Sequence, residues 1–205
     1  MENKVLENHK LYLERVNFYR SFGYDLELER DFIIDKSLPI LGEILEIGTG
    51  KGHFALALAK RGYTFKSIDI SRQDQEVALL NLRYFKLEKN VALSIEDARF
   101  LSFRSKSFNT VFSINVFHHL EEPLKVLKEI TRVLTPYGKV VLSDFTDKGL
   151  EVINACHTQE NRRHDYFKHN LDEAKEYFFA LGFEIKEFES QLQRVLVINK
   201  EEKGK

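Results

Sequence analysis

The sequence predicts a doubly wound α/β fold, in which helices cover both faces of a mostly parallel sheet that closes with an antiparallel hairpin. Two observations carry this prediction. Short apolar runs alternate with longer amphipathic stretches over most of the chain, and the last two apolar runs are separated by only a few polar residues. Five parallel strands and two hairpin strands give a predicted sheet of seven strands.

The composition predicts one domain that spans residues 1–205. Of its 205 residues, 43% are hydrophobic and 17 are Phe, which is enough for one sizeable core. The net charge of −1 gives no overall attraction to nucleic acid or anionic lipid, so neither a nucleic-acid nor a membrane partner is expected. The single cysteine, the lack of a signal peptide and the lack of any ~20-residue apolar run predict a cytoplasmic protein.

Residues 1–40 are predicted to form two helices that lead into the sheet and act as a lid. Apolar positions recur at helical spacing, the stretch 22–25 interrupts them, and Pro39 ends the second helix. Three tyrosines of this segment could line a lid over a ligand, although helix packing is the favoured role for each: Tyr12, Tyr19 and Tyr24.

Residues 41–145 carry the alternating pattern and are predicted to bind the ligand. The predicted strands are 43–47, 65–69, 91–95, 110–114 and 139–144. The predicted helices between them are 54–60, 71–85 and 124–134. Phe100 and Phe103, after the third strand, are expected in the core rather than stacked on a ligand.

Residues 146–205 are predicted to hold a substrate-side segment and the closing hairpin. The periodicity weakens over 147–170, so an irregular segment that sets specificity is expected there. A helix over 171–181 ends at Gly182, and strands over 183–188 and 194–199 form the hairpin.

Polar residues and glycines follow the predicted parallel strands, where an open parallel sheet binds its ligands. Gly48, Gly50 and Gly52 follow the first strand, so the backbone can turn sharply and bring amide groups close to a ligand. Asp69 ends the second strand, where a carboxylate can accept hydrogen bonds from both hydroxyls of a ribose. These positions predict a nucleotide-type ligand.

The glycine spacing separates the possible ligands. A dinucleotide fingerprint places glycines at its first, third and sixth positions, but the sixth position counted from Gly48 is His53. A nicotinamide-dependent dehydrogenase is therefore disfavoured. A P-loop is excluded as well, because no Gly-Lys-Ser/Thr follows at the required distance.

The remaining pattern, acidic-x-Gly-x-Gly-x-Gly from Glu46 to Gly52, resembles the first motif of class I S-adenosylmethionine-dependent methyltransferases. The resemblance continues at Asp69, at Asp97 and over 108–142, and it implies a Rossmann-like fold with S-adenosylmethionine as cofactor and S-adenosylhomocysteine as product. It implies the cofactor-binding residues Glu46, Gly48, Thr49, Gly50 and Gly52 for the methionine portion, Asp69 for the ribose, Asp97 and Ala98 for the adenine, and Asn115 along the methionine portion. Ile70, next to Asp69, is implied as a further cofactor-binding residue.

The acceptor is predicted less directly. Asn115-Val-Phe-His118 replaces the Asn/Asp-Pro-Pro-aromatic motif of nucleobase and amide methylases, so the resemblance favours small-molecule acceptors, as in the quinone-biosynthesis type. Methyl transfer needs alignment more than a catalytic group, but a hydroxyl acceptor would benefit from a base. His118 and His119 are the candidates, and His53 is a weaker one, because its place at a helix N-terminus also suits a structural role.

Three interpretations remain for the segment Cys156–His169, which gathers one thiol, three histidines and several basic residues. It is a metal site, a pocket for an anionic acceptor or a solvated loop, and no ligand spacing typical of zinc supports the first.

Two alternatives to a small-molecule methyltransferase also remain open. One is a binding module without catalysis, and the other is a methyltransferase that acts on protein or RNA.

Overall fold

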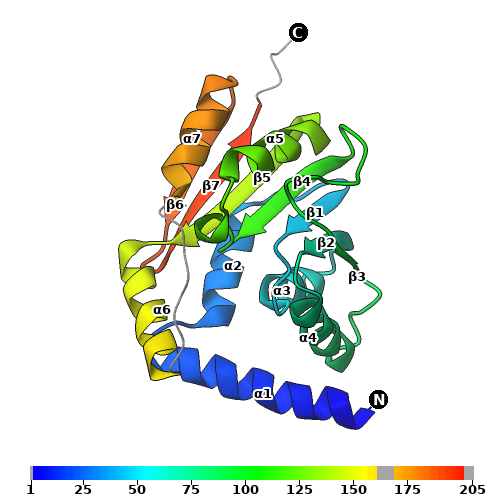
Figure 1. The fold of residues 1–205 in the computed structure, drawn as a ribbon, viewed down its shortest axis with the longest axis vertical. Helices are drawn as coiled ribbons and strands as arrows, with labels where there is room; N and C mark the ends of the chain where they lie inside the picture. The colour runs from blue at the N-terminus through cyan, green and yellow to red at the C-terminus, as the bar shows by residue number, and fades with distance from the viewer. Residues whose placement is uncertain (1, 161–168, 201–205) are drawn as a thin grey trace.

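The computed structural model describes residues 2–160 and 169–200, and within them it has one seven-stranded sheet with helices on both faces (Figure 1). The strands are β1 (Ile44–Ile47), β2 (Phe65–Asp69), β3 (Val91–Ile95), β4 (Phe108–Ile114), β5 (Leu134–Phe145), β6 (Glu184–Glu189) and β7 (Gln193–Asn199). Their order across the sheet is β3-β2-β1-β4-β5-β7-β6. β7 runs antiparallel to β5 and β6, and the other neighbouring pairs are parallel. The predicted fold class is confirmed.

The two predicted N-terminal helices are present as α1 (Glu2–Ser21) and α2 (Leu26–Lys36). Asp25 begins α2, because its side chain accepts hydrogen bonds from the backbone N–H groups of Glu27 and Leu28 at 3.0 and 3.2 Å. α1 crosses the molecule at the end of the sheet where β1 and β4 terminate (Figure 1). Tyr19 and Tyr24 are buried in an apolar cluster beside it, as helix packing requires.

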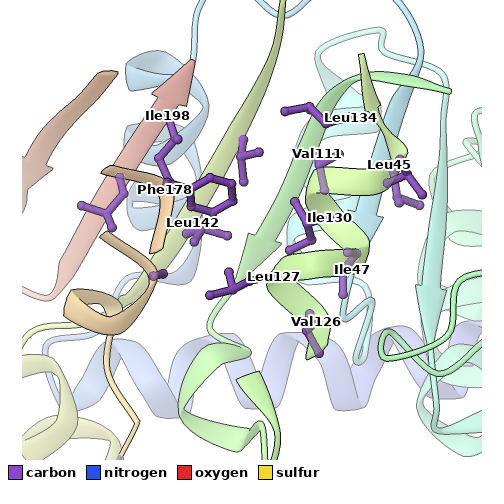
Figure 2. Close-up of a cluster of buried hydrophobic side chains, with 14 of the residues drawn as sticks. Leu45, Ile47, Val111, Val126, Leu127, Ile130, Leu134, Leu142, Phe178 and Ile198 are labelled. Carbon is purple, nitrogen blue, oxygen red and sulfur yellow. The ribbon is translucent and has the colours of Figure 1, made fainter. Parts of the chain in front are cut away.

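The helices form two layers around the sheet. α2, α3 (His53–Lys60) and α4 (Arg72–Tyr84) cover one face, while α5 (Pro123–Val133) and α7 (Leu171–Ala180) cover the other. Figure 2 shows the second layer, where Leu127 and Ile130 of α5 and Phe178 of α7 point onto the strands. Each fully buried side chain of this kind stabilises the fold by about 1.5–3 kcal/mol. This packing holds the strand ends, and the residues that follow them, in fixed positions.

The prediction of an irregular segment over 147–170 is wrong for its first half, which is the helix α6 (Asp147–Gln159). Thr146 begins it, with its hydroxyl accepting from Gly149 N–H at 3.0 Å. Its buried stripe is narrow and starts with a glycine: Gly149, Ile153 and Cys156. A β-carbon at Gly149 would lie 2.2 Å from the carbonyl oxygen of Leu192, so close packing requires this weak helix former and hides the apolar periodicity.

Smaller differences also separate prediction and structure. β5 begins at Leu134 rather than at Lys139, because Leu134 pairs with Phe108. The turn predicted at 136–138 is wrong, since these residues lie within β5 at a shift of its register with β4. Phe103 packs against the core as predicted, but the prediction for Phe100 is wrong, since its side chain is 69% exposed. No helix within 2–160 or 169–200 is long and apolar enough to cross a bilayer.

Candidate functional site

A cavity of about 600 Å³ lies beyond the carboxyl ends of β1, β2, β3 and β4. We call it the first cavity. It brings together most of the residues singled out from the sequence: Gly48, Gly50, Asp69, Ile70, Asp97, Ala98, Asn115 and His119. Apolar contacts come from Ile47, Ile68, Leu120 and Val126, so the wall mixes apolar surface with a few polar groups, as small-molecule sites do.

Asp69 ties the glycine loop to the second strand. Its Oδ2 accepts a hydrogen bond from Gly50 N–H at 2.7 Å, and its Oδ1 accepts one from Ser71 N–H at 2.8 Å. The N–H groups of Gly48 and Thr49 in turn donate to the carbonyl oxygen of Ile68 at 2.8 and 3.0 Å. A carboxylate has about four acceptor positions, so Asp69 retains capacity for ligand hydroxyls.

The side chains of Glu46 and of Thr49, which belongs to the glycine loop, are buried and do not line the first cavity. The Ser67 hydroxyl donates to Oε2 of Glu46, and the Thr49 and Ser67 hydroxyl oxygens are 2.6 Å apart. Gln75 donates to the Thr49 hydroxyl at 3.2 Å. These hydrogen bonds connect β1, β2 and α4 on the side of the loop that faces away from the cavity. They hold the loop in position without contacting the cavity.

Burial raises the pKa of Glu46 to about 8, with the hydrogen bond from Ser67 opposing the rise and the nearby Asp69 adding to it. Its carboxyl is therefore mostly neutral in the fold at pH 7, whereas the unfolded chain would have it ionised above its ordinary pKa of 4.5. A raised carboxyl pKa means that the unfolded state loses its proton first. The free energy of unfolding thus falls as the pH rises between these two values.

We expect Glu46→Gln to be more stable than the native chain at pH 8 and to lose this advantage toward pH 5. The difference in unfolding free energy should change by about 1 kcal/mol per pH unit over that range, since one pKa unit corresponds to roughly 1.4 kcal/mol. Urea unfolding at pH 5, 6, 7 and 8 measures it, with the exposed Glu176→Gln as control. A difference that stays flat with pH would show that Glu46 is not held neutral.

Asp97 and Ala98 form the end of the first cavity that follows β3. Both carboxylate oxygens of Asp97 accept from the Arg99 side chain at 2.7–3.1 Å, and this pairing lowers the pKa of Asp97. The same guanidinium donates to Glu122 at 3.0 Å, so Arg99 bridges two of the acids that line the cavity. A ligand that bonds to Asp97 therefore shares its carboxylate with Arg99.

Asn115, Tyr24 and Arg30 meet where α2 approaches the end of β4. Asn115 has a left-handed backbone with φ of 57°, which asparagine tolerates better than most residues, and its Nδ2 lies 3.5 Å from the Tyr24 hydroxyl. Arg30 is 8% exposed and donates to the same hydroxyl at 2.9 Å. Among the described residues, neither Asn115 Oδ1 nor Arg30 Nε has a hydrogen-bond partner.

Arg30 could not be selected as a site residue from the sequence, whereas Tyr24 is one of the three tyrosines considered there for a lid, and both Tyr19 and Tyr24 line the second cavity described next. The only available signal was an arginine at a position that a helical pattern assigns to the buried side of a helix. A buried guanidinium without a carboxylate partner is costly, so Arg30 marks a place where an anionic group would be stabilised.

A second cavity, of about 280 Å³, adjoins the first and shares with it Gly50, Asp74, Asn115 and His119. It is an open hollow lined by side chains from α1, α2, α6 and the turn between α1 and α2, among them Arg15, Tyr19, Tyr24, Arg30, Ile153 and His157. His118 lines this cavity and not the first. A third cavity, of about 360 Å³ between α1 and α4, shares Arg15, Lys51 and His53 with the second.

His53 stands at the wall of the second cavity, with its ring 5.5 Å from that of Tyr12. Burial, together with the charges of Arg30, Arg15 and Lys51, lowers the pKa of His53 to about 3. A helix N-terminus also disfavours the charged imidazolium, so the position of His53 at the start of α3 acts in the same direction. So low a pKa makes His53 a weak base at neutral pH.

The described residues of the segment 156–169 include one core residue, Cys156, and two residues that line cavities, His157 and Glu160. Cys156 is fully buried against α1 and α2 residues, and burial raises the pKa of its thiol. His157 lines the second cavity, and Glu160 pairs with Arg15 at 3.1 Å. Arg162, Arg163 and His164 lie outside the described residues. Within the part that the structure describes, no three His, Cys, Asp or Glu side chains are placed to hold a metal ion.

Comparison with known proteins identifies the fold and the motif region. The family described as "Methyltransferase domain" matches residues 45–142, the stretch that supplies the first cavity. Methyltransferase GfsG of Streptomyces halstedii is 32% identical over 108 residues, which are 52% of this chain and 39% of GfsG. Phosphoethanolamine N-methyltransferase 2 of Caenorhabditis elegans is 30% identical over 196 residues, which are 92% of this chain and 43% of that enzyme.

The chain thus spans about two-fifths of the length of these two relatives. A solved structure of a SAM-dependent methyltransferase from Aquifex aeolicus has the same fold, with a TM-score of 0.65 at 19% identity, covering 84% of this chain and 90% of the other. The strand order, the glycine loop and the family match agree with one another. This chain belongs to the class I S-adenosylmethionine-dependent methyltransferases, in the family of the methyltransferase domain.

Proposed function

We propose that this chain transfers a methyl group from S-adenosylmethionine to a small-molecule acceptor by in-line displacement. The observation that carries the proposal is the pair of adjoining cavities, which share Asn115 and His119 at their boundary. One cavity has the size and wall of a nucleotide-type site, and the other is an open space of about 280 Å³ beside it. Two reactants can be aligned in such an arrangement.

The first cavity fits the cofactor at three places. Asp69 would accept hydrogen bonds from the ribose hydroxyls, and Ile70 and Ala98 would contact the adenine ring, with Asp97 at its amino group. Two of the buried atoms that lack a hydrogen-bond partner among the described residues lie where the first cavity meets the second, and they complement the amino-acid end of the cofactor. Asn115 Oδ1 is an acceptor for its ammonium group, and Arg30 Nε is a donor for its carboxylate. Gly48 and Gly50 leave room for the backbone to approach the ligand.

The cofactor, when bound, supplies a methyl group that its sulfonium has already activated. The side chains of this protein then have to hold the acceptor in line and exclude water. His118 and His119 stand at the acceptor side, where either could receive a proton. Glu46, Thr49 and Gly52 do not line the first cavity. They would affect methionine binding indirectly, by fixing the conformation of the glycine loop.

A small acceptor is favoured over protein or RNA by the small volume of the second cavity, about 280 Å³, and by the absence of a strong net charge. The C. elegans relative is named for phosphoethanolamine, which is a small molecule. Arg15, Arg30 and Lys51 make the second cavity basic. Such surroundings disfavour a bulky cation as the acceptor.

Incubation with methyl-labelled S-adenosylmethionine and a fractionated cell extract tests this function. We expect label in a low-molecular-weight fraction and none in protein or RNA. Label in macromolecules would transfer the proposal to that class of acceptor. Cofactor binding without transfer to any fraction would indicate a binding module without catalysis. Metal analysis of the same preparation tests the metal interpretation of the segment 156–169.

A further inference from the structure

The buried face of α4 carries two amide side chains at positions where an amphipathic helix usually carries apolar ones. Gln75, Ala78 and Asn81 follow one another at intervals of three residues, so they share one face of the helix, and all three are buried. Asn81 is only 2% exposed. A buried amide is costly unless it is hydrogen-bonded, so the partners of this face indicate its role.

The first two of these residues contact the two ends of the glycine loop. Gln75 donates a hydrogen bond to the Thr49 hydroxyl at 3.2 Å. Ala78 packs against Gly52 so closely that a β-carbon added to the glycine would lie 2.8 Å from that of Ala78. This face of α4 is therefore in contact with the loop where the loop begins and where it ends.

Asn81 contacts the middle of the loop. Its Nδ2 donates to the backbone carbonyl oxygen of Lys51 at 2.8 Å. The N–H of the preceding residue, Gly50, donates to Asp69 at 2.7 Å, and both of these residues line the first cavity. Two adjacent residues of the loop are thus held by two side chains, a carboxylate of the cavity wall and an amide of α4.

The oxygen of the same amide connects the loop to α1. Oδ1 of Asn81 accepts from Nδ2 of Asn8 at 2.7 Å, and Asn8 is itself 9% exposed. Next to this contact the rings of His9 and Tyr84 stack with their centres 3.4 Å apart, and Figure 1 shows α1 beside α4. Because a carbonyl oxygen can only accept, the nitrogen of Asn81 faces Lys51 and its oxygen faces α1.

We propose that Asn81 is a positioning residue for cofactor binding, and that Asn8 couples the packing of α1 to the shape of the glycine loop. The inference rests on the proposed placement of the methionine portion of the cofactor against this loop. Asn8 holds the Asn81 amide in the orientation that bonds to the Lys51 carbonyl. Neither asparagine lines the first cavity, so both act on the cofactor through the loop. Such coupling is reciprocal, and a bound cofactor therefore stabilises the packed position of α1.

Calorimetric titration with S-adenosylhomocysteine tests the inference, on chains that thermal melting shows to be folded at the temperature of the titration. We expect Asn81→Ala to raise Kd by about 10-fold, the effect of losing one hydrogen bond that orders the site. Asn8→Ala leaves the bond to Lys51 in place and should raise Kd by about 3-fold. The double variant should bind no more weakly than Asn81→Ala, because Asn8 acts through Asn81. Additive losses, or native affinity in a folded Asn81→Ala chain, would overturn the inference.

Asn90→Ala is the matched control. The Asn90 side chain also donates to a backbone carbonyl oxygen, that of Tyr63 at 3.3 Å. These two residues precede β3 and β2, so they lie at the end of the sheet opposite the first cavity. The control should lower the melting temperature and leave Kd close to the native value. A rise in Kd equal to that of Asn81→Ala would mean that general loss of stability causes both, which contradicts a positioning role.

Hydrogen exchange tests the coupling in the opposite direction and decides the matter if Asn81→Ala does not fold. Saturation of the native chain with S-adenosylhomocysteine should slow the exchange of amides in residues 5–12 of α1, and the slowing should be smaller in Asn8→Ala. Exchange that does not respond to the ligand, or responds equally in the two chains, contradicts the inference while cofactor binding stands. If the native chain binds no S-adenosylhomocysteine, the proposed function fails, and this inference fails with it.

Discussion

Asp69→Ala is expected to weaken cofactor binding by on the order of 100-fold. The substitution removes the proposed acceptor for the ribose hydroxyls, and two hydrogen bonds to a charged group contribute about 3 kcal/mol together, where 1.4 kcal/mol is tenfold in Kd. It also leaves the N–H groups of Gly50 and Ser71 without the carboxylate that orders the loop. Calorimetric titration with S-adenosylhomocysteine measures the change.

The matched control for this variant is Asp31→Ala, which removes an exposed carboxylate paired with Arg61 far from the loop. That variant should bind the cofactor with native affinity. Thermal melting of both variants shows whether they remain folded under the conditions of the titration. An Asp69→Ala chain that is folded and binds within a factor of three of the native chain would exclude Asp69 from the site.

Gly52→Ala is expected to destabilise the fold by about 2–4 kcal/mol and to disturb the glycine loop. Gly52 has φ of +79°, and a β-carbon there would lie 2.8 Å from the β-carbon of Ala78 and 3.0 Å from its α-carbon. A strained backbone costs about 1–3 kcal/mol and overpacking about as much. Because the obstacle includes backbone of α4, it cannot be relieved by rotating a side chain.

Gly62→Ala separates the two causes. Gly62 has φ of +86°, but a β-carbon added there would have no atom within 4 Å, so this variant carries the backbone strain alone. Urea unfolding should therefore give a larger loss for Gly52→Ala than for Gly62→Ala. Equal losses would mean that the contact with Ala78 places no constraint on the loop. Only Gly52→Ala should also weaken binding of S-adenosylhomocysteine.

The same contact explains a feature of the sequence. The third glycine of the loop stands one position too early for a dinucleotide fingerprint, and in the structure it begins α3 and lies directly against α4. Its spacing therefore follows from how α3 and α4 pack. Local patterns of this kind, at strand ends and turns, are what a single sequence reveals well, and they are sufficient to predict the fold class and eight of the residues that line the first cavity.

The features that were missed depend on contacts between distant parts of the chain. In the sequence, Asp144 is an acid at a strand end like any other. Only the fold shows that its side chain contacts His118, which lies 26 residues earlier in the chain. Arg30 resembles an ordinary helix residue until α2 packs beside the end of β4. α6 was missed because its buried stripe is short and begins with Gly149, whose role depends on the residue that precedes β7. Phe100 was misjudged because apolar character alone does not determine burial.

The central claim is that the strand ends form a site for S-adenosylmethionine, and competitive binding tests it most directly. Calorimetric titration of the native chain with S-adenosylhomocysteine should give saturable binding with a Kd in the micromolar range. The nicotinamide dinucleotide at millimolar concentration should neither bind saturably nor displace it. Saturable binding of the nicotinamide dinucleotide with no binding of S-adenosylhomocysteine would contradict the claim.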